Sequence, residues 1–459
     1  MKKVLAMLLT GAMVFSLAAC GSSAPATTEA PAETTEAPAE EAAPAEEAAE
    51  APAEPAGPVT LNVTTTFAGE DTNAQNYQDA IEAWQTETGN TVNDASGTAV
   101  ETFKARVISD FEMGSEPDVL FYFNGVDSNP FVEAGKVASI DDIRAAYPDY
   151  ANNMKDGMMG ASPVDGKNYS VPCNGYWEGL FVNKTVLEAA GVDMPSATTT
   201  WDEFMEICQK IKDAGFTPIA ASFAEVPHYW FEFCIYNYLD PATHNILPES
   251  IDDVHGKAWV DGITDMKTLY EKEFLPANTL SATDGETMQL FFDGKAAFLI
   301  DGSWRVGGIE ENVENIDDFT VTYVPGKNNR KTTDIIGGLS SGWYITKKAF
   351  DDPEKQKACV DFVTYMTSDE MVSKFASVSA TALKNGSSVD RAALSSLASA
   401  GLDLVAGATG MTGAVQDQVT QENRVPVFNG MPDIVTGKVQ VADAVQQLLD
   451  LVAKGKAAE

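Results

Sequence analysis

Two repeating patterns of hydrophobic and polar positions run along the chain from residue 59 onward. Short apolar runs predict strands, and apolar residues spaced three and four apart predict amphipathic helices between them. The predicted strands are 59–63, 118–123, 216–220, 296–300 and 321–324. The predicted helices include 99–112, 286–292 and 354–366, and the C-terminal 390–459 looks mostly helical. Strands that alternate with helices through short connections are typical of α/β architecture.

Local signals mark the ends of several predicted helices. Gly89 and Gly114 each follow a helical pattern, and glycine commonly ends a helix. Thr200 and Glu203 form a capping box at the start of another helix, because each side chain can reach the backbone amide of the other residue.

Polar loops that follow strands are candidate ligand sites, because α/β sheets bind ligands beyond the carboxyl ends of their strands. The loop 67–71 follows the first predicted strand and contains Glu70. The loop 124–129 follows the strand "DVLFYF" and contains Asn124 and Asp127. We therefore expect Glu70, Asn124 and Asp127 to lie near a bound ligand.

The first twenty residues predict export from the cytoplasm. Lys2 and Lys3 precede an apolar run of 16 residues, which is too short and too poorly flanked for a stable membrane span. Small residues before Cys20 resemble the bacterial lipobox, in which the cysteine becomes a lipidated N-terminus. We expect a signal peptide at 1–19 and lipid anchorage to the cell membrane through Cys20. The alternative is an ordinary signal peptide whose cysteine is incidental.

Residues 20–58 are expected to form a disordered tether. The segment 21–58 contains nine Glu, seven Pro and no basic residue, so it has almost nothing to bury. The remaining 59–459 is too long for one ordinary core and predicts two lobes. The formal net charge of the chain, −38, makes nucleic acid and anionic membrane surfaces poor partners.

The other cysteines predict neither a zinc site nor a disulfide framework. Cys173, Cys208, Cys234 and Cys359 are widely spaced, and no CxxC or Cys/His pair occurs. We expect no metal and no cofactor. The sequence leaves open whether one pair of these cysteines is joined.

Six segments in the same order resemble one protein family over nearly all of 59–459. They are "SEPDVLFYF", "VEAGKVASIDDI", "DGKNYSVPCNGYWEGLFVNKTVLEAAGV", "TTTWDEFMEICQKIKDAG", "FFDGKAAFLIDGSWR" and "GGLSSGWYITKKAFDDPEKQKACVDFVTYMTSDE". Together they are similar to the extracellular solute-binding proteins of ABC importers, in the carbohydrate-binding group that includes the maltose-binding protein.

The resemblance implies a two-lobed α/β fold of the type II periplasmic-binding-protein kind, with a ligand cleft between lobes that close about a hinge. It implies an N-terminal lobe of 59–172 plus about 338–390, and a C-terminal lobe of 173–337 plus about 391–459. Crossovers are expected near 172–173, near 334–338 and near 390. It further implies a monomeric binder, not an enzyme, that passes a sugar or oligosaccharide to a membrane permease.

A sugar site needs aromatic rings for the apolar faces of the ligand and planar polar groups for its hydroxyls. The segment 169–184 places two large aromatic residues between an amide and a carboxylate at the first expected crossover. The candidates from this segment are Asn174, Tyr176, Trp177 and Glu178. Other candidates, from positions that line the cleft in the family, are Glu225, His228, Trp230, Trp304, Arg305 and Trp343.

Two other functions fit parts of the sequence. An acidic chain with aromatic residues could bind a polyamine, which needs several carboxylates close together. A lipid-anchored hydrolase could use paired carboxylates such as Glu70 and Glu178 as acid and base. No nucleophile elbow or metal motif supports the hydrolase.

Overall fold

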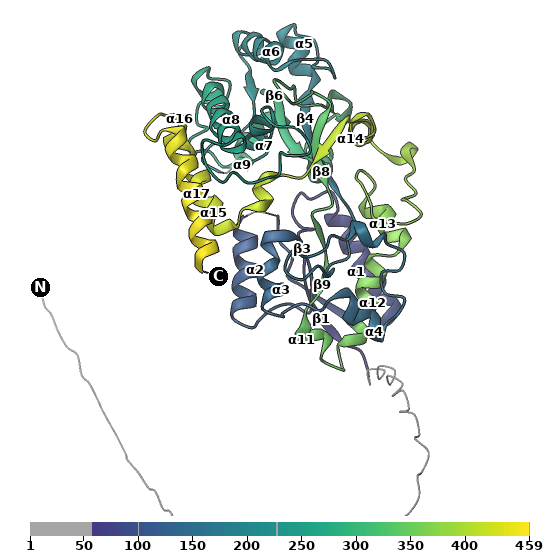
Figure 1. Ribbon diagram of the computed structural model, residues 1–459. Coiled ribbons are helices and arrows are strands. Elements are labelled where there is room, and N and C mark those ends of the chain that lie inside the picture. The colour runs from purple at the N-terminus through teal and green to yellow at the C-terminus, as the bar shows by residue number, and fades with distance from the viewer. Residues whose placement is uncertain (1–56, 100, 226–227, 459) are drawn as a thin grey trace, which may run out of the picture. The chain divides into compact units, whose positions relative to one another are not determined.

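The computed structural model describes residues 57–458 apart from 100 and 226–227, and it describes no side chains for 228 and 455–458. The predicted signal peptide, Cys20 and the tether as far as residue 56 lie outside the described residues. Within the described residues the chain builds two separate β-sheets with helices packed on them (Figure 1). The predicted α/β class is therefore confirmed.

The first sheet has four strands in the order β2–β1–β3–β9. The strands are β1 (Thr60–Thr64), β2 (Thr91–Asp94), β3 (Val119–Phe123) and β9 (Ser341–Ile345). The first three are mutually parallel, whereas β9 runs antiparallel to β3. Around them lie α1 (Ala74–Thr88), α2 (Glu101–Glu112), α3 (Asn129–Glu133), α4 (Ile140–Ala146), α11 (Lys347–Phe350), α12 (Gln356–Met366) and α13 (Asp369–Phe375).

The second sheet has six strands in the order β10–β8–β4–β6–β5, with β7 also paired to β4. They are β4 (Tyr176–Asn183), β5 (Thr217–Ile219), β6 (Ala296–Gly302), β7 (Phe319–Thr322), β8 (Asp334–Gly338) and β10 (Gly410–Thr412). The helices of this half are α5 (Lys184–Ala190), α6 (Trp201–Asp213), α7 (His228–Tyr236), α8 (Val254–Glu271), α9 (Asp284–Phe292), α10 (Val306–Asn312), α14 (Ser396–Gly407), α15 (Gln421–Asn429), α16 (Met431–Val435) and α17 (Val441–Ala458).

Short 3₁₀ helices connect several of these elements. They are η1 (Gly125–Asp127), η2 (Asp156–Met158), η3 (Ser303–Arg305), η4 (Ile316–Asp318), η5 (Arg391–Ala393) and η6 (Val415–Gln418). The predicted capping box is present at the start of α6, where Thr200 and Glu203 bond to each other's backbone amides. The same arrangement, formed by Thr283 and Glu286, begins α9.

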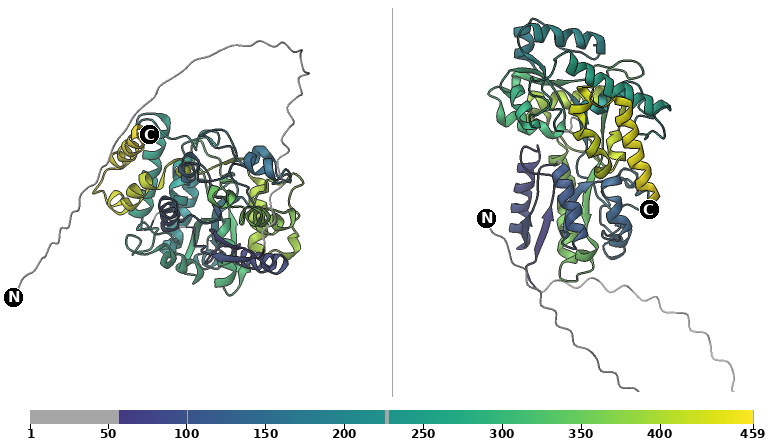
Figure 2. Two further views of the ribbon diagram at one scale, coloured as in Figure 1. Left: turned by 90° about the horizontal axis from the view of Figure 1, so that it is seen from below. Right: turned by 90° about the vertical axis from the view of Figure 1, so that its left-hand side faces the viewer.

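Each sheet has its own hydrophobic core. The clusters around the first sheet draw their buried residues from 61–173 and 343–383. The clusters around the second sheet draw theirs from 177–336 and 397–448, with one residue from the connecting segment, Val378. We call these halves the N-terminal and C-terminal lobes; Figure 2 shows them from two further directions. The exact lobe boundaries stay a prediction.

Two connections between the lobes run side by side. Val171 bridges to Trp343 in the N-terminal lobe, and Tyr176 pairs with Gly338 in the C-terminal lobe. Gly175 lies between them, and its amide donates to the carbonyl of Ala380 at 2.8 Å. A Cβ atom at Gly175 would lie only 2.5 Å from the carbonyl oxygen of Gly338. Only glycine permits this close approach of backbones at the crossing.

Candidate functional site

Two adjoining cavities lie between the lobes. The first has a volume of about 1110 Å³ and the second of about 1650 Å³, each including space open to solvent. Their walls share Asp71, Ala99, Glu101, Tyr229 and Trp304, so the cavities are neighbouring parts of one cleft. The carboxyl ends of strands in both lobes lead into it, as expected for an α/β ligand site.

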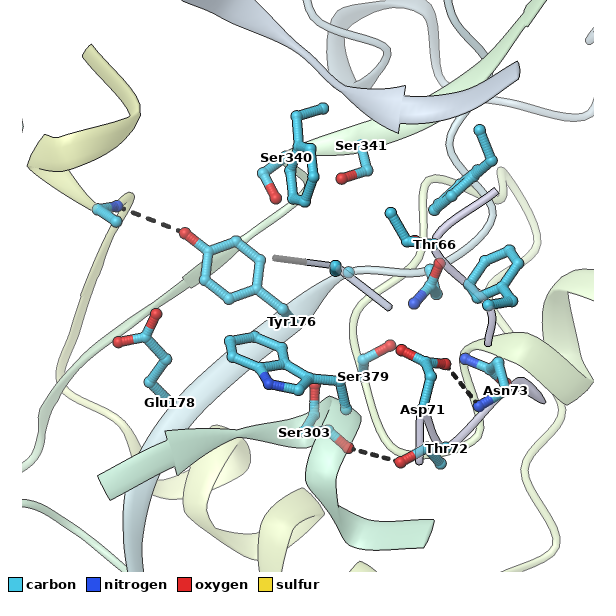
Figure 3. Close-up of a pocket in the computed structure, with 18 of the residues that line it drawn as sticks. Thr66, Asp71, Thr72, Asn73, Tyr176, Glu178, Ser303, Ser340, Ser341 and Ser379 are labelled. Carbon is cyan, nitrogen blue, oxygen red and sulfur yellow. Dashed lines mark hydrogen bonds between the residues drawn. The ribbon is translucent and has the colours of Figure 1, made fainter. Parts of the chain in front are cut away.

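The two walls of the first cavity come from different lobes (Figure 3). The loop after β1 and the start of α2 form the N-terminal wall, whereas β4, η3 and η6 form the C-terminal wall. In Figure 3, Tyr176 and Glu178 lie on one side of the cavity, and Asp71, Thr72 and Asn73 lie on the other. The close-up also shows Ser340 and Ser341 along the connection between the lobes.

Strand alternation explains which residues of the 169–184 segment line the cleft. Tyr176 and Glu178 are two positions apart on β4, so they face the same side, and both line the first cavity. Asn174, just before the strand, also lines it. Trp177 lies between them and faces the opposite side of the sheet.

Trp177 therefore departs from its expected place in the cleft. Its side chain is fully buried in a core cluster of the C-terminal lobe. The ring stacks on Phe181 with centroids 5.8 Å apart, and the indole nitrogen donates to the carbonyl of Val378 at 2.6 Å. A Cβ atom at Gly401 would lie 2.2 Å from this ring, so α14 packs directly against it. These contacts fit a core residue.

Three half-buried aromatic residues border the cleft on the C-terminal side. Trp304, in η3, lines both cavities. Its ring centroid lies 6.1 Å from that of Tyr176 and 5.4 Å from that of Tyr229. Tyr229 was not among the predicted residues. The trio presents ring surface of the kind that packs against the apolar face of a ligand.

Glu178 is buried without a full set of partners. Its carboxylate is 2 % exposed, and Oε2 has no hydrogen-bond partner among the described residues. Burial, together with the nearby carboxylates of Glu232, Asp417 and Asp301, raises the pKa of Glu178 well above its usual range. A group in this state is held away from water and still offers an acceptor to a ligand.

The loop after β1 supplies a second acidic group and joins the lobes. Asp71 accepts from the amide of Asn73 at 2.8 Å, and burial raises the pKa of Asp71 to about 7. The next residue, Thr72, donates its hydroxyl to the carbonyl of Ser303 at 3.0 Å and accepts from the amide of Gly307 at 3.0 Å. The N-terminal wall is thereby bonded to the C-terminal lobe beside the cavity.

Two cationic side chains line the cleft within the described part of the chain, and both have carboxylate partners. Lys104 in α2 lies 2.7 Å from Asp127. Arg305 in η3 lies 2.7 Å from Asp301 and 3.2 Å from Asp284, and these carboxylates raise the pKa of the guanidinium. Both cations are thus neutralised by the protein itself.

The second cavity gathers the other predicted cleft residues. Glu70, Glu225, Trp230, Trp304 and Arg305 all line it. Glu225 accepts from the amide of Asp284 at 2.7 Å. Trp230 is almost fully buried, and its indole nitrogen has no hydrogen-bond partner within the described residues. The side chain of His228 lies outside the described residues.

Besides Trp177, three predicted residues lie outside the cleft walls. Asn124 accepts hydrogen bonds from the hydroxyls of Ser170 at 2.8 Å and Tyr344 at 2.6 Å, so it ties β3 to its neighbours. Asp127 is buried against Lys104. Trp343 is carried by β9 into the N-terminal core, where its ring lies 5.2 Å from that of Phe121. Each is explained by contacts within the protein.

Several cleft residues were not predicted. They are Asp71, Asn73, Glu101, Lys104, Tyr229, Ser303, Ser379, Gln416 and Asp417. Asp71 was in a loop already singled out, and its position after β1 was a usable signal. Gln416 and Asp417 come from η6, far along the chain, and no local motif distinguishes them. Their place is fixed by Glu232, which accepts from the amides of Val415 and Gln416 at 2.9 and 2.7 Å.

The described residues contain no group of three or more metal-binding side chains, and no helix among them is long and apolar enough to cross a membrane. Cys173, Cys208, Cys234 and Cys359 are all free and buried. No pair of these four is joined.

Comparison with known proteins places the chain among binding proteins. The sequence model of the family described as "Bacterial extracellular solute-binding protein" matches residues 79–396, more than half of the chain. The Multiple sugar-binding protein of Streptococcus mutans is 25 % identical over 289 residues, which are 61 % of this chain and 64 % of that protein. The sn-glycerol-3-phosphate-binding periplasmic protein UgpB of Rhizobium meliloti is 25 % identical over 300 residues, which are 62 % and 65 %.

Solved structures confirm the two-lobed fold. A "Chitin oligosaccharide binding protein" superposes with a TM-score of 0.73 at 20 % identity, covering 87 % of this chain and 99 % of that chain. "SBP RafE in complex with raffinose" gives a TM-score of 0.65 at 18 % identity, covering 85 % and 98 %. The chain thus matches the solved structures over nearly their whole length, but spans less than two thirds of the curated relatives it matches. The predicted family resemblance and fold class are confirmed.

Proposed function

The chain belongs to the bacterial extracellular solute-binding proteins, and from this premise we propose that it captures a sugar or oligosaccharide in the interlobe cleft. The captured ligand is then delivered to the membrane permease of an ABC importer. The family is extracellular and consists of binding proteins, so its members work outside the cytoplasm. We propose no catalytic role for the carboxylates of the cleft.

One observation carries the proposal: aromatic rings and unpartnered hydrogen-bonding atoms meet in the same cavity. Glu101 Oε2, Glu178 Oε2, Ser379 Oγ and Gln416 Oε1 are buried and lack a partner among the described residues, and all four side chains line the first cavity. Three of these atoms are acceptors only, and Ser379 can also donate. Sugar hydroxyls would satisfy them while the C–H faces pack on the aromatic trio.

The proposed ligand-binding residues follow from their positions on the walls. Asn174, Tyr176, Glu178 and Trp304 would serve the first cavity, together with the newly placed Asp71, Tyr229 and Gln416. Glu70, Glu225, Trp230 and Arg305 would serve the second cavity. Asp301 and Asp284 also line the second cavity, where they hold Arg305 in place.

Contacts between the lobes support a binder that encloses its ligand. On one flank of the cleft, Thr72 bonds to the backbone of Ser303 and Gly307. On the other flank, the buried Arg424 of α15 lies 2.8 Å from Glu101 of α2. Closure of two lobes about a hinge is the general motion of such proteins. These contacts fit a closed arrangement.

We further propose that the protein is a monomer anchored to the cell membrane by lipid on Cys20, with 20–58 as the tether. The support is the sequence alone: small residues before Cys20 after an apolar run, then a segment poor in groups to bury. Metabolic labelling with a fatty-acid analogue tests the anchor, and Cys20→Ser should abolish the label and release the protein.

The test of sugar capture is a titration of the purified protein with monosaccharides, oligosaccharides, polyols and spermidine. Intrinsic tryptophan fluorescence is a suitable signal, because Trp304 and Trp230 line the cleft. We expect saturable binding of one saccharide series with an affinity near micromolar, about −8 kcal/mol. A response to spermidine alone would overturn the sugar proposal in favour of a polyamine binder.

A further inference from the structure

The charged groups that line the cleft are far from balanced. Eight carboxylates line the two cavities, against two cations, Lys104 and Arg305, in the described part of the chain. Lys104 is neutralised by Asp127, and Arg305 by Asp301 and Asp284. Glu101 is also paired with Arg424 at 2.8 Å, and Glu70 lies 3.9 Å from Arg305. Within the described residues, the four cleft carboxylates without an ion-pair partner are Asp71, Glu178, Glu225 and Asp417. This charge acts on whatever enters.

Glu178 is the carboxylate best placed to meet a ligand directly. It is 2 % exposed, lines the first cavity from β4, and leaves Oε2 without a partner among the described residues. A buried acceptor without a partner costs free energy, and a buried unpaired charge costs more. Because burial raises the pKa of Glu178 well above its usual range, the folded protein must either bury this charge or hold a proton on it. A ligand that brings a hydrogen-bond donor and a positive charge would pair with the ionised form and remove either cost.

The surroundings of Glu178 suit a cation as well. Tyr176 lies two positions before it on the same face of β4, and Trp304 lies 6.1 Å from Tyr176 between ring centroids. Faces of tyrosine and tryptophan attract cations when water is excluded. Asp417, in η6, lines the same cavity. Carboxylates and aromatic faces thus surround one space.

We propose that the cleft selects a saccharide carrying a protonated amine, with Glu178 as the residue that receives it. The inference rests on the proposed function, because it names the class of sugar bound at that same site. An anionic ligand such as a phosphorylated polyol, the kind named for one relative, would meet an excess of like charge, because both cations of the walls are already paired. The same site would therefore reject it.

The test compares ligands that differ only at the amine. Chitosan oligosaccharides carry free amines, and chitin oligosaccharides of the same length carry the same nitrogen acetylated and uncharged. Isothermal titration calorimetry of the purified protein at about pH 7 measures both, with glucosamine against glucose as the monomer pair. We expect the amine form to bind at least about tenfold more tightly in each pair, the scale of one charge-assisted hydrogen bond.

Two variants assign the preference to Glu178. Glu178→Gln keeps the shape and removes the charge, so it should abolish the tenfold preference, and the affinity ratio within each ligand pair is the quantity compared. Glu188→Gln, at an exposed position on α5, is the matched control and should leave the preference intact. If Glu178→Gln fails to fold, Asp417→Asn removes another carboxylate of the same cavity and should reduce the preference for the amine. Circular dichroism checks that each variant folds.

Each outcome decides something different. Equal or tighter binding of the acetylated or neutral partner would overturn the amine inference and leave sugar capture standing. Tight binding of glycerol 3-phosphate would also overturn it. Binding of spermidine with no saccharide response would overturn sugar capture itself, and silence across all saccharides would overturn both. Loss of the preference in Glu178→Gln but not in Glu188→Gln would support the full proposal.

Discussion

Glu178 and Asp301 are buried carboxylates on neighbouring strands of one sheet, but only Asp301 has hydrogen-bond partners in the protein for both oxygens. Both are 2 % exposed, and Gly179, next to Glu178, pairs with Asp301 across β4 and β6. Asp301 lies 2.7 Å from Arg305 and accepts from the amide of Gly302 at 2.8 Å. Glu178 Oε2 has no partner in the part of the chain that the structure describes.

The difference shows that burial of an acidic residue does not by itself mark a ligand contact. The oxygens of Asp301 accept hydrogen bonds from the protein and so fix Arg305 at the edge of the second cavity. Glu178 keeps an acceptor for the first cavity, at a cost to the unliganded fold. Changes at the two positions should therefore have opposite effects on stability.

The largest effect is expected from Asp301→Ala. This change leaves Arg305 with Asp284 as its nearest remaining partner and breaks a largely buried ion pair, so the free energy of unfolding should fall by about 3 kcal/mol. Urea denaturation measures it, with the exposed substitution Asp293→Ala, in the turn before β6, as the control. An unchanged unfolding free energy would show that Asp301 is not a structural partner.

Trp304→Ala should weaken ligand binding more than it weakens the fold. The ring is half-buried and lines both cavities, so its loss removes packing surface for the ligand and should lower affinity by roughly 30-fold, about 2 kcal/mol. Calorimetry with the best saccharide from the titration measures this. The paired variant Trp177→Ala should instead destabilise the fold by about 3 kcal/mol or more, because that ring is core.

A reversed pattern for the two tryptophans would contradict the alternation along β4. Strong loss of affinity in Trp177→Phe with normal stability would return Trp177 to the ligand site, where the sequence had suggested it. Trp177→Phe removes less of the buried side chain than Trp177→Ala does. It therefore allows affinity and stability to be measured if the alanine variant does not fold.

Glu178→Gln should raise the free energy of unfolding of the unliganded protein by about 1 kcal/mol. The amide carries no charge to bury, so the penalty of the carboxylate is relieved. Urea denaturation at about pH 8 measures it, because Glu178 is ionised in the unfolded chain there and folding must either bury that charge or take up a proton. A loss of stability similar to that of Asp301→Ala would mean that Glu178 is held by the protein after all.

The smallest expected effect is a shift of stability with pH. Burial raises the pKa of Asp71 to about 7 and that of Asp417 to about 6, above the ordinary values that apply in the unfolded chain. Between about pH 4 and these values the folded state binds more protons than the unfolded state, so this stability is fully present below about pH 4 and is lost as pH rises to about 6 to 7. Thermal unfolding across this range measures it.

Asp71→Asn is the control for that pH effect. The variant has no carboxyl at this position, so its unfolding temperature should fall less between about pH 5.5 and 7.5 than that of the parent protein. If both proteins give the same pH profile, Asp71 does not keep its proton in the folded state.

The strands and helices could be predicted because each has a local signature. The run "DVLFYF" predicts β3, and Thr200 with Glu203 predicts the start of α6, since both signals depend on residues close in sequence. The exposed strand β2 was missed, because only one of its residues, Val92, is strongly apolar. The end of β7 was placed two residues too late.

The site was predicted in part, for a similar reason. Tyr176, Glu178 and Trp304 follow from segments with a family pattern, whereas Tyr229, Gln416 and Asp417 reach the cavity only through the packing of distant elements. Trp177 was misplaced because an aromatic residue in a polar stretch suggests a site, although the two-residue period of a strand sends it to the core. Asn124 and Asp127 illustrate polar loops whose side chains bind the protein.

The bonds of Thr72 bear on how long a complex lasts. Its hydroxyl donates to Ser303 and accepts from Gly307, both across the cleft, and its own amide donates to the carbonyl of Trp304 at 3.0 Å. An enclosed ligand can depart only after such bonds between the lobes break. Thr72 would then influence the residence time of the ligand through these bonds, whereas the rate of capture depends on the walls of the open cleft.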